Sequence, residues 1–247
     1  MSLSVHILGA GGAYPPPGYA GPSLLLEAPE ARVVVDCGSS CCSRLLQAGF
    51  SPCEIDAVYV SHEHADHWAG MGELLSARGA EGCPGLRVIL PGEVAERLSS
   101  RLVEALPRGR EVRVEVLEPG SSVALGGGLE MAPFRVRHQV PTYGILVYEG
   151  GDGLLAYTAD TAYDHRLAEA LRGYRIAVVD STLPTGHGGE GVSEMHMSVS
   201  TAWRLAVEEA GVGIAVAFHL SPPSLAEARR RRLPRLLVPG ELAVINV

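Results

Sequence analysis

Three histidines and one aspartate fall within six positions of the chain, in the segment 61–67 (SHEHADH). His62 and His64 are two residues apart, so an extended backbone would place both imidazole rings on one side. The apolar residues 57–60 indicate a strand just before this segment, and functional groups are often presented by loops at strand ends. Imidazole and carboxylate donors suit zinc, manganese or iron better than copper(I). This density of donors favours a metal site over a polar turn exposed to solvent.

Three more potential ligands stand where apolar strands are expected to end. They are His138, Asp160 and His219. A catalytic zinc ion usually takes three protein ligands and keeps one position open, so a single ion would not need all of these donors together with the histidine cluster. The sequence therefore indicates two adjacent metal ions.

Short β-like runs alternate with amphipathic stretches along the whole chain. Strands are predicted over residues 3–8, 23–27, 32–36, 56–60, 87–90, 112–117, 129–137, 144–148, 153–158, 176–180, 213–218 and 242–247. Helices are predicted over residues 40–48, 67–77, 92–105, 164–171, 199–210 and 224–232, with loops over 15–18 and 185–191. This interleaving favours an α+β fold with helices covering β-sheets. Because no low-complexity linker divides the chain, we expect a single domain over residues 1–247.

The order of the donors resembles that of the metallo-β-lactamase superfamily, and the resemblance covers nearly the whole chain. Within the superfamily, the chain looks most like the ribonuclease Z and phosphodiesterase branch. The supporting motifs are residues 8–15 (LGAGGAYP), 36–38 (DCG), 138–141 (HQVP) with Gly144, and 157–161 (YTADT). The resemblance implies a four-layer αββα sandwich, with two mixed β-sheets face to face, helices outside, and the metals at one edge between the sheets.

The resemblance also implies a role for each donor. His62, His64 and His138 would hold the first metal, Asp66, His67 and His219 the second, and Asp160 would bridge the two. Asp36 would orient the histidine loop from the second shell of the site. His196 matches a histidine near the scissile phosphate that stabilises charge or protonates the leaving group, so the expected catalytic residues are Asp66 and His196. A surface cap before a helix is the alternative for His196, and Asp180 is the nearest candidate for its acidic partner.

Two divalent cations define the expected chemistry, with Zn²⁺ the first choice and Mn²⁺ or iron as alternatives. Two metals about 3.5–4 Å apart can share a water and lower its pKa from about 15.7 to roughly 7, so a metal-bound hydroxide would attack the substrate. The cations would also neutralise charge that grows on the substrate oxygens. Ser61 and Ser181 lack a motif that would support a serine nucleophile.

The connection between the strands predicted over 144–148 and 153–158 bears on the substrate. Ribonuclease Z carries a long tRNA-gripping arm there, whereas this sequence has only residues 149–152 (EGGD), a tight hairpin turn. We therefore expect no conventional tRNA processing, and predict hydrolysis of a small phosphodiester: a cyclic phosphate, a cyclic nucleotide or a short oligonucleotide. The alternatives are an ester, thioester, sulfate or lactone hydrolase, and a non-catalytic metal-binding protein of cofactor assembly. The resemblance leaves a homodimer open.

Composition narrows the classes of partner and compartment. The formal net charge of -8 argues against broad nucleic-acid binding, although a bound metal could still attract a small anion. No apolar run approaches the roughly 20 residues of a membrane helix and no secretory signal is apparent, so we expect a cytoplasmic protein without a membrane partner. All 20 basic residues are arginine and amide residues are sparse, which favours a thermophilic source, although a genome rich in G and C explains this equally well.

The remaining reactive side chains are interpreted as structural or exposed. Five cysteines predict free thiols in a reducing compartment, with a structural zinc site at Cys37, Cys41 and Cys53 as the minor alternative. The arginines at 229–232 are interpreted as a solvated helix end rather than a phosphate site. His187, in the Gly-rich loop 185–191, is expected to face solvent. His6 and His165 are expected to be structural or exposed.

Overall fold

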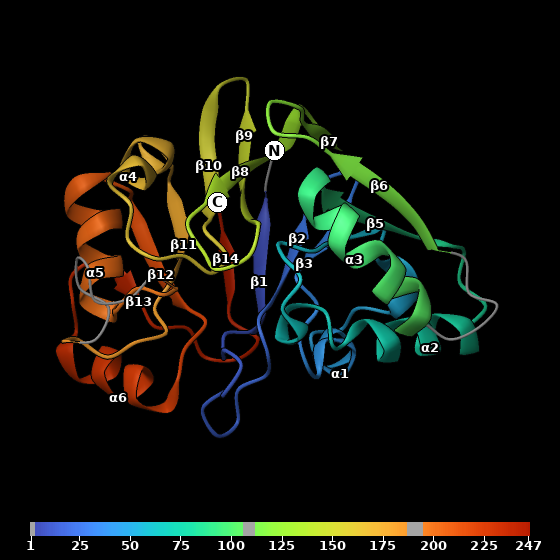
Figure 1. The fold of residues 1–247 in the computed structure, drawn as a ribbon, viewed down its shortest axis with the longest axis horizontal. Helices are drawn as coiled ribbons and strands as arrows, with labels where there is room; N and C mark the ends of the chain where they lie inside the picture. The colour runs from blue at the N-terminus through green and yellow to red at the C-terminus, as the bar shows by residue number, and fades with distance from the viewer. Residues whose placement is uncertain (1–2, 106–111, 187–194) are drawn as a thin grey trace.

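Two seven-stranded β-sheets lie face to face, and helices cover the outer face of each sheet (Figure 1). The computed structural model describes residues 3–105, 112–186 and 195–247. The arrangement is the αββα sandwich predicted from the sequence, and that prediction is confirmed.

The two sheets have closely similar strand topologies. The first sheet consists of β14 (Val244–Asn246), β1 (Ser4–Gly9), β2 (Ser23–Glu27), β3 (Arg32–Val35), β4 (Ala57–Tyr59), β5 (Leu86–Pro91) and β6 (Val112–Leu117). The second consists of β13 (Leu236–Leu237), β12 (Ile214–Phe218), β11 (Ile176–Asp180), β10 (Asp152–Tyr157), β9 (Thr142–Glu149), β8 (Leu129–Val136) and β7 (Val123–Gly126). In each sheet, antiparallel pairs occupy one side and parallel pairs the other.

The helices divide between the sheets. Those on the first sheet are α1 (Cys41–Gln47), α2 (Met71–Ala80) and α3 (Gly92–Ala105), and those on the second are α4 (His165–Leu171), α5 (Val199–Trp203) and α6 (Pro222–Arg231). Short 3-10 helices span Pro52–Glu54 and Ala65–His67, and a π-helix, Arg204–Glu209, continues α5. Within the described part of the chain, no helix has the length and apolar character needed to cross a bilayer.

Strand pairing explains why distant residues meet at one edge. Strands β10, β11 and β12 are parallel, and β8 runs in the same direction because β9 is antiparallel to both β8 and β10. Their carboxyl ends therefore lie at the same edge of the second sheet. In the first sheet, β3 and β4 are parallel and likewise end together. The loops after β4, β8, β10 and β12 carry the predicted metal ligands, and the loops after β3 and β11 carry Asp36 and His196.

The core has an inner and two outer layers because alternate strand residues point to opposite sheet faces. In β2, Leu24 and Leu26 join the cluster between the sheets, whereas Leu25 packs with the helices on the outer side. Both faces of the strand are therefore apolar, as expected for strands with both faces buried.

Most predicted elements are confirmed, and the strands at 23–27, 112–117 and 176–180 match residue for residue. The helix predicted to start at residue 67 is wrong at its first turns, since α2 begins at Met71. The cause is an anchored loop: the backbone of Cys37 donates a hydrogen bond to the His67 carbonyl and accepts one from Gly70. The sequence did not predict the short strands β7 and β13.

The prediction of five free cysteines is wrong for two of them. Cys53 and Cys83 form a disulfide, with their Cα atoms 5.1 Å apart, whereas Cys37, Cys41 and Cys42 are free and buried. The alternative zinc site is also wrong, because the Cys53 sulfur is bonded to Cys83. The two disulfide segments are brought together by the buried Arg78, which donates hydrogen bonds to carbonyls on both sides of the disulfide.

Candidate metal centre

The structure brings together all seven predicted metal ligands at the edge where the six strands end. His196 joins Asp160 and His219 in one group of possible ligand atoms there, and the seven predicted ligands form two groups, each with its atoms within 4.8 Å of one another. One group is His62, His64, His138 and Asp160, and the other is Asp66, His67 and His219. The donors come from the loop after β4 and from the ends of β8, β10 and β12.

Three imidazoles define the first group. His64 Nδ1 lies 3.1 Å from His62 Nε2 and 3.1 Å from His138 Nε2. The other nitrogen of His138, Nδ1, donates a hydrogen bond of 2.9 Å to the Met195 carbonyl, which leaves Nε2 with a free lone pair. Three ring nitrogens thus face one point from three directions.

The second group combines a carboxylate with two imidazoles. Asp66 Oδ2 lies 3.1 Å from His219 Nε2 and 3.7 Å from His67 Nε2. Gly12 lies against this group, because a Cβ atom added there would come within 2.8 Å of the His219 ring. The loop after β1 therefore needs a glycine at this position to pack against the histidine.

The carboxylate of Asp160 lies between the two groups. Its Oδ1 is 3.3 Å from His67 Nε2 and 3.5 Å from His219 Nε2, both in the second group. Its Oδ2 is 3.7 Å from His62 Nε2 and 4.0 Å from His138 Nε2, both in the first. One side chain thus presents one oxygen to each group, as a bridging ligand would.

Two orphaned atoms test whether this centre fits cations. His67 Nε2 and Asp160 Oδ1 are both buried without a hydrogen-bond partner among the described residues. Buried polar atoms without partners are costly, and a cation bound between them would remove that cost. Together with the imidazole and carboxylate chemistry of the donors, these atoms fit a pair of divalent cations.

Asp36 fixes the orientation of the histidine loop through buried hydrogen bonds. This residue follows β3 with a φ of 56°, and its buried carboxylate accepts hydrogen bonds from Ser61 N (2.8 Å), Ser61 Oγ (2.9 Å), His67 Nδ1 (2.7 Å) and Tyr157 OH (2.6 Å). Since the Ser61 hydroxyl gives its proton to Asp36, His62 Nδ1 must donate to Ser61 Oγ, 2.9 Å away. The rings of His62 and His67 are therefore both oriented with Nε2 toward the other donor atoms.

Asp180 forms a similar network at the end of β11. Its carboxylate accepts hydrogen bonds from Thr161 N (2.9 Å), Thr182 N (3.0 Å), Thr182 Oγ1 (2.6 Å) and His196 Nδ1 (2.9 Å). The Thr182 hydroxyl is left as an acceptor for His219 Nδ1, at 2.8 Å. Asp180, suggested by the sequence as the acidic partner of His196, is therefore hydrogen-bonded to it.

His196 lies beside both donor groups, with one ring nitrogen within 4.8 Å of donor atoms of Asp160 and His219. Its ring centroid is 5.3 Å from those of both His138 and His219, and its side chain is 15% exposed. Burial lowers the pKa of His196, but the Asp180 carboxylate more than offsets this and raises the pKa to about 9. The ring is thus held at the open side of the donor groups.

Electrostatics keeps the first group in its metal-binding form. Burial lowers the pKa of His62 well below its usual value, and the neighbouring His67 lowers it further. Burial also lowers the pKa values of His64 and His138. Neutral imidazoles are the species that bind metal ions.

The charged forms are favoured at His67, in the second group, and at Asp160, between the two groups. Burial disfavours the charged forms of both His67 and Asp160, but their neighbours outweigh it. The carboxylates of Asp160 and Asp36 raise the pKa of His67 well above its usual value, and His219 and His67 lower that of Asp160 well below its usual value. This buried site therefore attracts positive charge.

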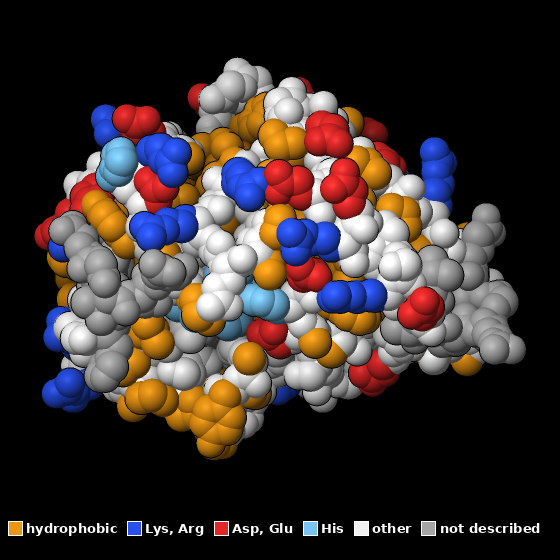
Figure 2. All heavy atoms as spheres, in the orientation of Figure 1, with side chains coloured by type: hydrophobic (Ala, Val, Ile, Leu, Met, Phe, Trp, Pro, Cys, Tyr) orange, Lys and Arg blue, Asp and Glu red, His pale blue; other side chains and the backbone are white. Residues whose placement is uncertain are grey.

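The donor cluster is reached from one face of the molecule. Figure 2 shows pale blue histidine atoms recessed near the middle of this face, with arginine side chains above them. Asp66 is 22% exposed, compared with 3% for Asp160, so the second group is open on the side of Asp66.

The other side chains singled out in the sequence lie outside the donor groups. His6 pairs with Glu27 at 3.0 Å, and His165 is 82% exposed, as predicted. Three arginines occupy the last turn of α6, in keeping with a helix end, and Arg229 donates to the Tyr19 hydroxyl. His187 and most of the loop 185–191 lie outside the described residues.

Sequence reasoning missed the hydroxyl groups behind the donors. Ser61 was considered only as a nucleophile, and Thr182 and Tyr157 were not assigned a role. A signal was present, because Ser61 directly precedes the first histidine of the cluster and Thr182 stands two residues after Asp180. Short side chains beside buried carboxylates are good candidates for second-shell hydrogen bonds.

Comparisons with known proteins agree with this geometry. A family model described as a β-lactamase superfamily domain matches residues 31–220. A ribonuclease Z from Mycobacterium sp. (strain KMS) is 32% identical over 250 residues, which cover 90% of this chain and 85% of the relative.

Two solved structures show the same fold. The metallo-β-lactamase fold protein YhfI from Bacillus subtilis superposes with a TM-score of 0.83 at 23% identity, covering 100% of this chain and 99% of the other. A diphosphatase of the PhnP family superposes with a TM-score of 0.79 at 17% identity, covering 100% and 98%.

Proposed function

Since this chain belongs to the metallo-β-lactamase superfamily and is a ribonuclease Z-like hydrolase, we propose that it is a dinuclear phosphodiesterase that acts on small phosphodiesters. The carrying observation is that Asp160 offers one oxygen to each donor group beside a hydrogen-bonded pair, His196 and Asp180. Its mycobacterial relative is named as a ribonuclease, which supports phosphodiester cleavage.

The donor groups assign the ligands of the two cations. His62, His64 and His138 would hold one, Asp66, His67 and His219 the other, and Asp160 would serve both. We propose Zn²⁺ because five imidazoles dominate the set, with carboxylates completing it. When bound, the two cations would lower the pKa of a water and neutralise charge growing on the phosphate oxygens.

The protein's own residues would position the substrate and move protons. Asp180 accepts the Nδ1 proton of His196, which leaves Nε2 as the ring nitrogen that can reach a substrate. From there, His196 would donate a proton to the leaving oxygen. Asp66, the more exposed of the two donor carboxylates, would accept a hydrogen bond from the attacking water. Asp36 would hold His67 and the Ser61 loop still during the reaction.

The hairpin between β9 and β10 supports a small substrate. Gly150 and Gly151 alone separate these strands, and both have positive φ values, 56° and 96°, which suit a two-residue hairpin turn. A turn this short does not contain a tRNA-gripping arm. The net charge of -8 also disfavours a long nucleic acid.

A paired assay would test this proposal. Protein stripped with a chelator and reloaded with Zn²⁺ or Mn²⁺ would be given bis-p-nitrophenyl phosphate and, separately, p-nitrophenyl acetate. We expect metal-dependent hydrolysis of the diester, and at least a roughly hundredfold loss in Asp160→Asn, since both groups lose their shared ligand. Asp152→Asn, on the exposed hairpin, should behave as wild type.

Each other result would point elsewhere. Hydrolysis of the acetate alone would replace the phosphodiesterase with an ester hydrolase. Metal bound without hydrolysis of either substrate would favour a non-catalytic metal-binding protein. Cleavage of a precursor tRNA at a rate comparable with that of the small diester would contradict the proposed substrate size.

A further inference from the structure

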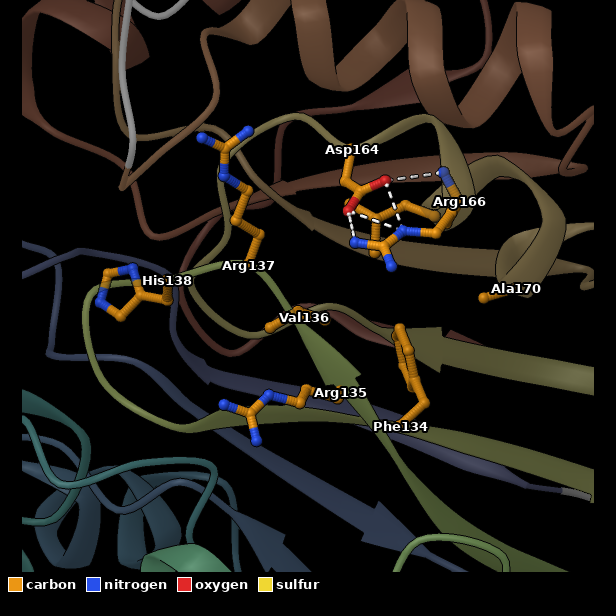
Figure 3. Close-up of a pocket in the computed structure, with 9 residues that line it drawn as sticks. Phe134, Arg135, Val136, Arg137, His138, Asp164, Arg166 and Ala170 are labelled. Atoms are coloured by element: carbon orange, nitrogen blue, oxygen red, sulfur yellow. Dashed lines mark hydrogen bonds and ion pairs between the residues drawn. The ribbon is translucent and has the colours of Figure 1, made fainter.

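A cavity of about 460 Å³ opens beside the metal centre, between the end of β8 and α4. Figure 3 shows His138 and Arg137 at one end of this cavity and Phe134 and Ala170 at the other. His138 belongs both to the cavity wall and to the first donor group. A ligand in the cavity would therefore adjoin a phosphate held at the metal centre.

The wall of the cavity has an excess of positive charge. Three arginines line the cavity, namely Arg135, Arg137 and Arg166. Arg135 pairs with Glu93, and Arg166 pairs with Asp164, so their charges are matched by carboxylates. Arg137 is exposed and its guanidinium has no carboxylate partner among residues 3–105, 112–186 and 195–247. A planar guanidinium of this kind can bind a phosphate through two parallel hydrogen bonds.

Phe134 and Ala170 form an apolar wall at the end of the cavity away from His138, and Leu167 also lines the cavity. The Phe134 ring packs over Gly144 of β9, where a Cβ atom would collide with it, so the glycine leaves the space that the ring occupies. A flat aromatic or apolar group would fit against this wall, since aromatic rings offer nucleobases a surface for stacking.

We propose that this cavity binds the nucleotide unit next to the scissile phosphodiester, with Arg137 holding a second phosphate and the Phe134 wall contacting the base. This inference rests on the proposed phosphodiesterase function and narrows its substrate to a nucleotide that carries a further phosphate. The position of His138 between the cavity and the donor groups sets the order of the substrate's parts: the scissile phosphate at the metals, then the second phosphate, then the base.

Binding measurements test this inference apart from catalysis. Thymidine 3′,5′-bisphosphate and thymidine 5′-monophosphate contain no phosphodiester, and they differ by one phosphate. Calorimetric titration of the metal-loaded protein should show about fivefold or tighter binding of the bisphosphate. Arg137→Ala should bring the ratio of the two dissociation constants close to one, and Arg137→Lys should keep part of it. The matched control is Arg172→Ala, at the other end of α4, which should keep the wild-type ratio.

Two results would overturn the inference: equal affinities in the wild-type protein, or an unchanged ratio in Arg137→Ala. Hydrolysis of bis-p-nitrophenyl phosphate, measured on the same preparations, reports separately on the proposed function. Loss of that hydrolysis with the binding ratio intact would reject the phosphodiesterase and leave the phosphate-binding cavity standing.

Discussion

Asp36 in the first sheet and Asp180 in the second have closely similar surroundings. Each lies at the carboxyl end of a parallel strand, is buried, and accepts hydrogen bonds from a backbone amide, a hydroxyl group and a histidine. The hydroxyl, Ser61 or Thr182, in turn accepts a hydrogen bond from a second histidine. The same unit of a carboxylate, a hydroxyl group and two histidines thus appears in both halves of the molecule.

The two units differ in which histidine the carboxylate contacts. Asp36 holds His67, which is fully buried and belongs to the second donor group, whereas Asp180 holds His196, which is 15% exposed. Asp36 also binds Tyr157 from the opposite sheet, while Asp180 is held by backbone amides of its own sheet. A histidine closed to solvent can hold a metal, and one open to solvent can move a proton. We infer that the first unit stabilises the metal centre and the second serves the reaction.

The largest expected effect is that of His196→Ala. We expect kcat for a diester to fall by about 10²–10⁴, as is usual when a general acid is removed. Metal content, measured by atomic emission, should stay at the wild-type level, since the metal ligands remain. His165→Ala, an exposed histidine of α4, provides the control and should not change kcat. Loss of metal in His196→Ala would contradict the inference that the Asp180 unit serves the reaction rather than metal binding.

Asp36→Asn should weaken metal binding by about 10–100-fold, the usual cost of removing a second-shell partner. The amide has one acceptor oxygen for four donors, so His67 and Ser61 would lose their fixed orientation. Competition with a chromophoric chelator would measure the affinity, and circular dichroism would check folding. Asp180→Asn is the matched change, and it should lower kcat while retaining metal. Equal metal loss in both variants would contradict the assigned roles.

The hydroxyl groups offer a finer comparison. Ser61→Ala and Thr182→Val each leave a buried histidine nitrogen without its acceptor, which costs about 1–3 kcal/mol. We expect a loss of roughly tenfold in kcat/KM for each. Ser61→Ala should also lower metal occupancy under a chelator challenge more than Thr182→Val does. The reverse order would show that His219 depends on its support more than His62 does.

The smallest effect on catalysis is expected for Tyr157→Phe. Burial raises the pKa of Tyr157 well above its usual value, and the Asp36 carboxylate raises it further, so the hydroxyl stays protonated and donates to Asp36. Its loss should lower the free energy of unfolding by about 1.5–3 kcal/mol, the range for hydrogen bonds to charged groups. Urea denaturation would measure this. A drop in kcat as large as that of Asp36→Asn would give the tyrosine a role beyond stability.

The sequence could place the donors because each sits where a strand pattern stops. His138, Asp160 and His219 each follow an apolar run, and parallel strands bring their carboxyl ends to one edge. Aliphatic and aromatic residues dominate these runs and indicate the strands. Residue types and their positions at strand ends therefore indicated a site for two metals, whereas the role of each ligand came from the family resemblance.

The remaining features depend on contacts between distant segments. Cys53 and Cys83 are 30 positions apart, and no spacing rule pairs them. The first turns of the predicted helix from residue 67 are replaced by a loop because the backbone of Cys37 binds it from another strand end. The cavity beside His138 exists only because β8 and α4 meet there. Such features require the assembled fold, which periodicity does not describe.

The two-glycine turn between β9 and β10 is also an engineering opportunity. Because the strand pairing continues to Glu149 and Asp152, added residues at the tip would extend outward from the sheet rather than into it, and such tips tolerate insertions well. Grafting the arm of a ribonuclease Z at this tip would produce a chimera in which the residues of the two donor groups are unchanged. The rate at which the chimera cleaves a precursor tRNA would show whether the arm alone is enough to select long nucleic-acid substrates.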